Sequence, residues 1–254
     1  MEKLSDLSES QRYYLDGFIK ERFKKTPTLE KCNDILNSLV ESDDLNEGFF
    51  WEEKYRNTKD LRPNCFEYDS CFVDLLIENN LHNKIKNLTK MDYTLSHIQI
   101  RKSNCKDSSY MPWHRDSYTI DGNLVGNIPP SHKIIFYPKV RSSNSNQDTP
   151  RLSILKGTHR CIYTSAKSNE FIIPGFSNYD NEFAKIHKRV DYKPSKDEFI
   201  IFDTSALHHA NIDDNDTGYI RVIYSFVLDF QFKEKYSMKP EHEKLNSIFR
   251  EMSK

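Results

Sequence analysis

The sequence predicts a mainly β domain, a sandwich or jelly roll with helices packed outside it. Three observations support this fold class: apolar residues at helical spacing dominate the first ninety residues, separated β-rich runs follow, and a last helical stretch lies near the C-terminus. No linker divides the 254 residues, and a chain of that length can bury one large core. We therefore expect a single domain over residues 1–254, with a helical part at 1–90, a β core at 91–230 and a C-terminal helix at 231–254.

Helical spacing recurs in three stretches of the N-terminal part. The first covers residues 13–23 behind a polar start at Ser8–Gln11, and the second follows Pro27. A third stretch at 72–88 and a C-terminal one at 240–252 show the same apolar periodicity. All four predict helices that bury one face in the core, and nothing in them demands a further role.

From Tyr93 onward the pattern changes to short runs that are rich in β-branched and aromatic residues. The first run tends to alternate apolar and polar positions, which is typical of a strand with one buried face. Polar segments with turn chemistry, such as 142–148, separate the runs. The predicted strands lie at 95–101, 133–137, 151–155, 198–202 and 219–227.

The composition argues against several classes of protein. Lys plus Arg is 37 and Asp plus Glu is 38, which gives a net charge of −1, whereas proteins that bind long nucleic acid usually carry a basic excess. No apolar run approaches the roughly 18 residues of a membrane span, and the N-terminus lacks the apolar stretch of a signal peptide. Five scattered cysteines without a C-x-x-C pair argue against a disulfide framework or a thiolate zinc site, so we expect a reducing, cytoplasmic location.

The segment Trp113-His114-Arg115-Asp116 is the first candidate for chemistry. In an extended segment His114 and Asp116 point to the same side, so both could contact one metal ion. A His-x-Asp pair alone arises often by chance, but a second histidine far downstream adds weight to it. His208 follows the apolar run 199–202, at a position where a metal ligand at the mouth of a barrel would lie. Two imidazoles and one carboxylate leave three positions on an octahedral iron(II), which a bidentate co-substrate and dioxygen require, as in non-haem iron oxygenases.

The remaining histidines are weaker candidates, because they lack an acidic partner at metal-ligand spacing. A lone histidine is usually a surface residue or a satisfied structural one. We therefore expect no metal-binding role for His82, His97, His132, His159, His187 and His242.

Arg221 is a cation within the apolar run 219–227, thirteen residues after His208. A buried, unpaired guanidinium is energetically costly, so this side chain needs a carboxylate partner. A structural interpretation pairs it with an internal Asp or Glu, and a functional one pairs it with the distal carboxylate of 2-oxoglutarate. Beside a His-x-Asp pair and a distal histidine, we favour the functional interpretation.

With these residues the chain resembles the iron(II)- and 2-oxoglutarate-dependent oxygenases, specifically the phytanoyl-CoA dioxygenase-like group. The resemblance covers roughly residues 93–230 and is carried by motifs at 113–116, 151–159, 202–208 and 215–221. In the second motif, Lys156 stands where the group usually has proline, and Thr158 stands where it has serine. The resemblance implies a double-stranded β-helix, a jelly-roll or cupin-like barrel, with iron at its mouth.

The same resemblance implies roles for individual residues. His114, Asp116 and His208 would bind the iron, and Arg221 would bind the co-substrate. The Phe-Asp-x-x-x-x-His spacing of the group selects His208, whereas the usual distance to the arginine favours the adjacent His209. Only one of the two can point inward from an extended segment, and we favour His208.

The resemblance also implies the chemistry. Oxidative decarboxylation of 2-oxoglutarate to succinate, with dioxygen, would drive hydroxylation of a small-molecule substrate. Asp116 favours hydroxylation, because related halogenases replace this carboxylate with a small residue that makes room for chloride. Gln99 and Lys133 lie on strands that flank the His-x-Asp pair, where each could reach a co-substrate carboxylate or could equally face solvent.

Other functions stay open beside this one. A member of the fold that has lost its chemistry could act as a binding protein, and a cupin-like isomerase or zinc hydrolase could use the same ligands. Neither of those enzymes requires Arg221, so the arginine discriminates between them and an oxygenase. Oxidation of a nucleic-acid base or a protein side chain is a further alternative, and the near-zero net charge counts against long nucleic acid.

The sequence does not identify the substrate or the oligomeric state, because loops around the mouth of a barrel set specificity. Candidate lid segments lie at 121–131 and 142–150. Cationic side chains that could suit an anionic substrate, but that are usually just solvated, are Arg115, Arg151, Lys156 and His159.

Overall fold

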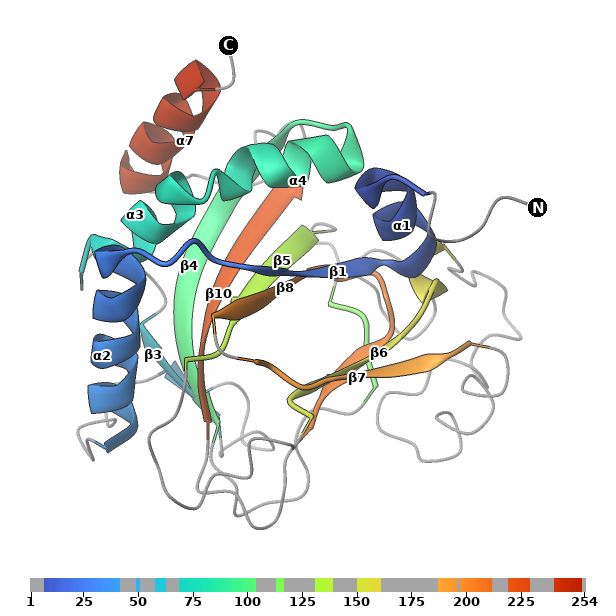
Figure 1. Cartoon of the computed structure of the whole chain (residues 1–254), viewed down its shortest axis with the longest axis horizontal. Coiled ribbons are helices and arrows are strands. Elements are labelled where there is room, and N and C mark those ends of the chain that lie inside the picture. Colours follow the sequence, from blue (N-terminus) through green and yellow to red (C-terminus); the bar gives the residue numbers. More distant parts are fainter. Residues whose placement is uncertain are drawn as a thin grey trace.

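The computed structural model of the chain contains two antiparallel sheets and a set of helices (Figure 1). Its strands are β1 (Phe18–Arg22), β2 (Phe49–Phe50), β3 (Thr58–Arg62), β4 (Tyr93–Ser103), β5 (Ser131–Phe136), β6 (Leu152–Leu155), β7 (Arg189–Tyr192), β8 (Glu198–Asp203), β9 (His208–Ala210) and β10 (Tyr219–Leu228). The large sheet has seven strands in the order β1-β8-β5-β10-β4-β3-β2, and the small sheet has three in the order β7-β6-β9. The structure describes residues 7–41, 49–50, 58–62, 69–103, 113–116, 131–138, 150–160, 187–195, 197–211, 219–228 and 240–252.

The two sheets face each other and enclose an apolar core, which confirms the predicted double-stranded β-helix. Side chains from the facing surfaces of both sheets meet in this inner core, as expected for strands that alternate inward and outward positions. Its buried members are Ile135, Tyr137, Leu152, Ile154, Tyr192, Ile200, Phe202, Ala206 and Ile223.

Helices cover the outer face of the large sheet (Figure 1). They are α2 (Pro27–Glu41), α3 (Cys71–Glu78), α4 (Leu81–Thr89) and α7 (Pro240–Met252). Val222 and Tyr224 of β10 pack in the same core as the apolar faces of these helices. The Tyr224 hydroxyl also donates to the Phe72 carbonyl at 2.8 Å. The sequence predictions for α2 and α7 are confirmed, and the five predicted strands overlap β4, β5, β6, β8 and β10.

The helix predicted over 13–23 is wrong in its second half. The helix α1 (Glu9–Asp16) begins with a capping box at Ser8 and ends at Gly17, whose φ of 83° lies in the left-handed region. A Cβ at Gly17 would lie 2.6 Å from His159 Nδ1, so glycine alone fits this turn. The apolar residues beyond it form β1, which pairs antiparallel with β8 at the edge of the large sheet.

The single helix predicted over 72–88 is two helices, α3 and α4. Asn80, between them, has φ 53°, a left-handed conformation that asparagine tolerates better than most residues and that a continuous helix cannot contain. The prediction of a wholly helical part at 1–90 is also wrong, because β1, β2 and β3 come from it and complete the large sheet. Apart from their last residues, the candidate lids at 121–131 and 142–150 lie outside the described part of the chain.

His132, which the sequence marks as isolated, joins α1 to the large sheet. The Tyr13 hydroxyl lies 2.5 Å from His132 Nδ1, and the Tyr93 hydroxyl lies 2.6 Å from Nε2. Burial raises the pKa of both tyrosines and lowers the pKa of His132, and the charge of Asp203 raises all three values. The two tyrosine hydroxyls and the imidazole are therefore neutral in these hydrogen bonds. The role of His132 here is structural, because it connects α1 to the large sheet.

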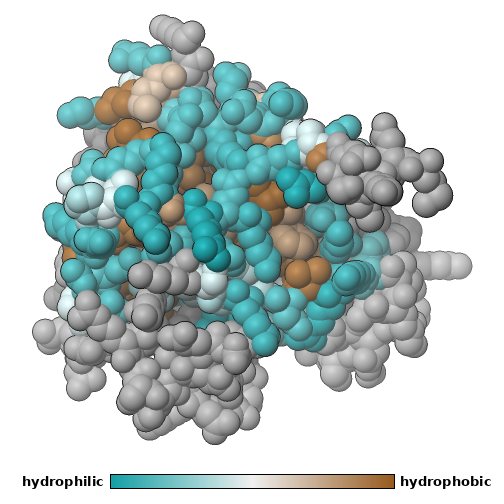
Figure 2. Space-filling model, viewed as in Figure 1, coloured by the Kyte–Doolittle hydropathy of each residue, from teal (hydrophilic) through white to brown (hydrophobic). Residues whose placement is uncertain are grey.

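The surface in Figure 2 is mainly hydrophilic, with brown apolar areas separated by teal polar side chains. Among the residues that the structure describes, the exposed large apolar side chains are Tyr14, Met91, Ile248 and Met252. Among the described helices, none combines the length and the apolar character needed to cross a membrane.

Stability should depend on pH through His82, which lies on α4 beneath α7. Its ring stacks on Phe249 with centroids 4.4 Å apart, no described residue bonds its nitrogens, and burial lowers the pKa of His82 to about 4 from 6.5. Because the folded value lies below the unfolded one, the stabilising contribution of neutral His82 is present above pH 6.5 and is lost as the pH falls towards 4. We expect His82→Phe to reduce the drop in the urea midpoint between pH 7 and pH 5.

Urea titrations of both proteins at the two pH values measure this effect, and His187→Asn is the control. A drop that is the same in wild type and His82→Phe would contradict the assignment to His82.

Candidate metal centre

The site is built on a two-residue antiparallel bridge between His114 and His208. The His114 amide donates to the His208 carbonyl at 3.0 Å, and the His208 amide donates to the His114 carbonyl at 3.1 Å. Side chains of directly paired residues lie on one face, so the two imidazoles stand next to each other, with ring centroids 4.3 Å apart.

Asp116 completes the group from two residues beyond His114. Its amide donates to the Thr204 carbonyl at 3.2 Å, which fixes the backbone, and its Oδ1 lies 3.2 Å from His114 Nε2 and 3.5 Å from His208 Nε2. The three ligand atoms lie within 4.8 Å of one another, and no other such group of three occurs among the described residues. One metal ion could contact all three.

His209 faces away from this group. It is the Cα partner of Ser153 on the outer face of the small sheet, and its ring lies 4.4 Å from that of Trp113. The alternation of side chains along β9 therefore brings His208 to His114 and Asp116 and turns His209 outward.

The protonation states suit metal binding. Burial acts to raise the pKa of Asp116, but the Lys133 ammonium and the two imidazoles outweigh it and hold that pKa well below its usual range. Burial and the neighbouring His114 lower the pKa of His208, whose Nδ1 lies 2.8 Å from the Ala206 carbonyl. With Nδ1–H donating there, Nε2 presents its lone pair to the site beside an ionised carboxylate.

Lys133 contacts a ligand residue in this structure. It was predicted to reach a co-substrate carboxylate or to face solvent, whereas its Nζ lies 2.5 Å from Asp116 Oδ2. The ammonium holds one carboxylate oxygen and leaves Oδ1 towards the imidazoles. The sequence predicts that Lys133 lies on a strand, but its contact with Asp116 depends on how segments that are distant in the chain pack together.

Arg115 connects the segment that contains His114 and Asp116 to the segment before His208 through hydrogen bonds, a role that the sequence did not indicate. It is 9% exposed, and its Nη1 donates to the Thr158 carbonyl at 2.8 Å and also to the Ser205 carbonyl. Thr158 in turn accepts from the Leu207 amide at 2.9 Å through Oγ1. Both carbonyls lie close in the chain or in space to the strand that carries His208, so Arg115 binds backbone groups beside that strand.

Arg221 and Gln99 both lie on the inner face of the large sheet. Arg221 is 4% exposed, and Gln99 is half-buried. Gln99 is the Cα partner of Ile223, so it lies one inward-facing position nearer to the three candidate ligands than Arg221 does. Lys133 is the partner of Ser225 on the same face, beyond Ile223. The predicted co-substrate residues therefore lie at successive positions along one surface that leads away from the three candidate ligands.

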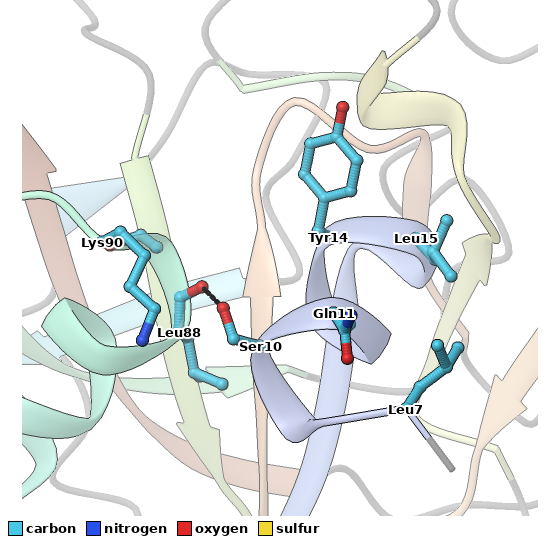
Figure 3. A pocket seen from close by; sticks show the side chains of 8 residues that line it. Leu7, Ser10, Gln11, Tyr14, Leu15, Leu88 and Lys90 are labelled. Carbon is cyan, nitrogen blue, oxygen red and sulfur yellow. Dashed lines mark hydrogen bonds between the residues drawn. The ribbon is translucent and has the colours of Figure 1, made fainter. Parts of the chain in front are cut away.

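A separate cavity lies outside the barrel between α1 and the end of α4 (Figure 3). Its volume is about 430 Å³, and the Ser10 hydroxyl donates to the Leu88 carbonyl at its wall, at 2.7 Å. None of the predicted site residues lines it; the lining residues are Leu7, Ser10, Gln11, Tyr14, Leu15, Leu88, Thr89 and Lys90.

Comparison with known proteins shows similarity in structure alone. No family model and no curated protein matches the chain. HygX from Streptomyces hygroscopicus with nickel, 2-oxoglutarate and hygromycin B bound is similar at a TM-score of 0.58 and 12% identity, covering 88% of each chain. EctD from S. alaskensis with 2-oxoglutarate and 5-hydroxyectoine gives 0.60 and 13%, covering 89% of this chain and 79% of EctD.

The epimerase SnoN in complex with Fe³⁺, α-ketoglutarate and nogalamycin RO is a third similar structure. Its TM-score is 0.60 at 10% identity, with coverage of 86% of this chain and 82% of SnoN. The chain thus has the fold of non-haem, 2-oxoglutarate-dependent oxygenases.

Metal affinities of single variants can show whether His208 or His209 binds the metal. We expect His208→Ala to weaken iron(II) binding by more than about 100-fold, since even a group that only orients a ligand contributes about 10–100-fold. His209→Ala is the matched control and should bind iron(II) like the wild type. Anaerobic equilibrium dialysis measures both affinities, and the reverse order would show that His209 is the ligand.

Proposed function

We propose that this chain is an iron(II)- and 2-oxoglutarate-dependent dioxygenase that hydroxylates a small molecule. The observation that carries the proposal is the grouping of His114, Asp116 and His208, whose ligand atoms lie within 4.8 Å of one another. Two imidazoles and one carboxylate suit iron(II) and leave coordination positions for a co-substrate and dioxygen.

The donor set fits the metal in detail. Asp116 is held as a carboxylate by Lys133, and the hydrogen bond from His208 Nδ1 to the Ala206 carbonyl leaves Nε2 as an acceptor for the ion. The fold is shared with structures that hold iron or nickel together with 2-oxoglutarate or α-ketoglutarate, which supports the same pair of cofactors here.

Within this proposal each residue has one task. When bound, iron(II) with 2-oxoglutarate and dioxygen supplies the oxidising chemistry, and succinate and carbon dioxide are the co-products. Arg221 binds the distal carboxylate of 2-oxoglutarate, and its burial excludes water from that contact. Lys133 keeps Asp116 Oδ2 away from the ion, and Gln99 lies between Lys133 and Arg221, where its amide can contact the co-substrate chain.

Epimerisation is the second candidate reaction, because SnoN, with the same fold, is an epimerase. Both reactions begin by breaking a C–H bond of the substrate, and they differ in whether oxygen is added afterwards. Asp116 argues against halogenation and does not separate hydroxylation from epimerisation.

A small-molecule substrate is proposed because HygX and EctD are described with hygromycin B and 5-hydroxyectoine. The narrower likeness to the phytanoyl-CoA dioxygenase-like group and the cytoplasmic location stay predictions of the sequence. A zinc hydrolase or cupin-like isomerase is disfavoured, because neither reaction uses a buried arginine such as Arg221 on the inner face.

Turnover of the co-substrate tests the proposal directly. Succinate should form from 2-oxoglutarate with iron(II) and ascorbate, and His114→Ala should abolish its formation, whereas His209→Ala should not. Arg221→Met should raise the dissociation constant of 2-oxoglutarate by about 10–100-fold, since hydrogen bonds to charged groups contribute about 1.5–3 kcal/mol. Succinate formation in His114→Ala, measured by chromatography, would reject the ligand assignment.

Labelled dioxygen separates the two reactions once a substrate is found. Hydroxylation places one ¹⁸O atom in succinate and one in the product, whereas epimerisation leaves the product unlabelled. Mass spectrometry of the product therefore decides, and an unlabelled, inverted product would overturn the hydroxylase proposal.

A further inference from the structure

We propose that Cys32 and Cys71 form a redox-sensitive modification site, at which a peroxide converts two buried thiols into a disulfide that joins α2 to α3. Both cysteines are free thiols in the structure, so the disulfide is a second, oxidised state of the same chain. The site lies outside the barrel and does not depend on the proposed function.

The two sulfur atoms lie close enough to bond. The Cys32 thiol on α2 donates to Cys71 Sγ at 3.3 Å, and Cys71 is the first residue of α3. The sulfurs of a disulfide are about 2 Å apart, so a shift of about 1 Å, which small side-chain rotations supply, brings the two atoms to bonding distance. The residues are thirty-nine positions apart in the chain, so the bond would join two separate helices.

The pair lies in the core between the helices and the outer face of the large sheet. There α2 and α3 lie side by side (Figure 1), and both cysteines belong to the same apolar core as Val222 and Tyr224 of β10. The carbonyl of Phe72, the residue after Cys71, accepts a hydrogen bond from the Tyr224 hydroxyl. A disulfide here would therefore fasten two helices to each other directly behind a central strand of the sheet.

Cys71 is the sulfur that reacts first. It begins α3, and the positive end of a helix dipole favours a thiolate at that position. Lys31, the neighbour of Cys32, pairs with Asp69 Oδ2 at 2.8 Å, and Asp69 Oδ1 accepts from the Cys71 amide at 2.8 Å. The Lys31 ammonium thus lies near enough for a charge on Cys71 to act on it, and a nearby cation also favours the thiolate.

Peroxide can reach the pair from the surface end of α3. Cys32 is 0% and Cys71 2% exposed, but Ser70, directly before Cys71, is exposed and Asp69 is only half-buried. The first turn of a helix opens at low free-energy cost, because its amides have no partner within the helix. Such opening exposes Cys71 before Cys32, which lies inside the longer helix α2.

The reaction is a two-electron oxidation in two steps. The Cys71 thiolate attacks one oxygen of hydrogen peroxide, the O–O bond breaks, and a sulfenic acid and hydroxide form; the hydroxide takes up the proton that Cys71 released. The Cys32 sulfur then attacks the sulfenic sulfur, and the hydroxyl leaves as water with the Cys32 proton. Two thiols and one peroxide thus give one disulfide and two waters. The hydrogen bond to Cys71 and burial raise the pKa of Cys32, which keeps Cys32 protonated until the second step.

Peroxide treatment of a full-length variant that keeps only this pair tests the inference. Cys65, Cys105 and Cys161 are replaced by serine, and iron is removed with a chelator so that it does not consume peroxide. Intact mass spectrometry should show the loss of two hydrogen atoms without added oxygen, and dithiothreitol should restore the mass. The urea midpoint of the oxidised protein should rise by about 1 M, because the bond closes a long loop in the unfolded chain.

Two single replacements in this background are the matched controls. Cys32→Ala should leave Cys71 to gain oxygen, as a sulfenic acid that dimedone traps. Cys71→Ser should leave Cys32 unmodified over the same time, because a buried and protonated thiol reacts slowly with peroxide. Neither control should show the rise in urea midpoint, and equal oxidation of Cys32 in Cys71→Ser would contradict first attack by Cys71.

Three results would overturn the inference. They are thiols that stay reduced at a peroxide concentration that fully oxidises free cysteine, oxygen added to either sulfur in place of a disulfide, and a disulfide between two chains, seen as a dimer on a non-reducing gel. If the variant does not fold, peptide mapping of the oxidised wild type decides, because cleavage before Asp69 separates Cys65 from Cys71. A cross-link between Cys32 and Cys71 supports the inference, whereas no cross-link, or one from Cys32 to another cysteine, overturns it.

Discussion

The bridge between His114 and His208 is the constraint on which the rest of the site depends. Two backbone hydrogen bonds of 3.0 and 3.1 Å hold residues ninety-four positions apart in register, and the Asp116 amide is bonded to Thr204 nearby. A slip of one residue along β9 would turn His209 inward and remove His208 from the group. The grouping of the three candidate ligands therefore depends on strand register, and Arg115 stabilises that register through the carbonyls of Thr158 and Ser205.

Cationic side chains project from the inner face of the large sheet at intervals along neighbouring strands. Lys133 contacts Asp116, and Arg221 lies two inward-facing positions further along the same face. The helices on the outer face make this arrangement possible, because residues such as Val222 and Tyr224 anchor the same strands in an apolar core.

Much of this was predictable from local pattern. Alternation predicted β4, runs rich in β-branched and aromatic residues predicted β8 and β10, and the His-x-Asp spacing with a histidine after an apolar strand indicated His114, Asp116 and His208. What could not be predicted depends on turn conformation, on very short strands and on contacts between distant segments.

Helical spacing in 13–23 also fits a helix followed by a strand, and only the left-handed turn at Gly17 separates the two. Short strands such as β7 and β9 have too few residues for a period to be recognised. The partners of His132, Lys133 and Arg115 come from distant segments, so no local pattern could reveal them.

The most direct test of the account is anomalous diffraction from crystals loaded with iron(II) under anaerobic conditions in the presence of 2-oxoglutarate. We expect one strong anomalous peak within bonding distance of His114 Nε2, Asp116 Oδ1 and His208 Nε2, with the distal carboxylate of the co-substrate at Arg221. A peak coordinated by His209, or no peak between these three side chains, would contradict it.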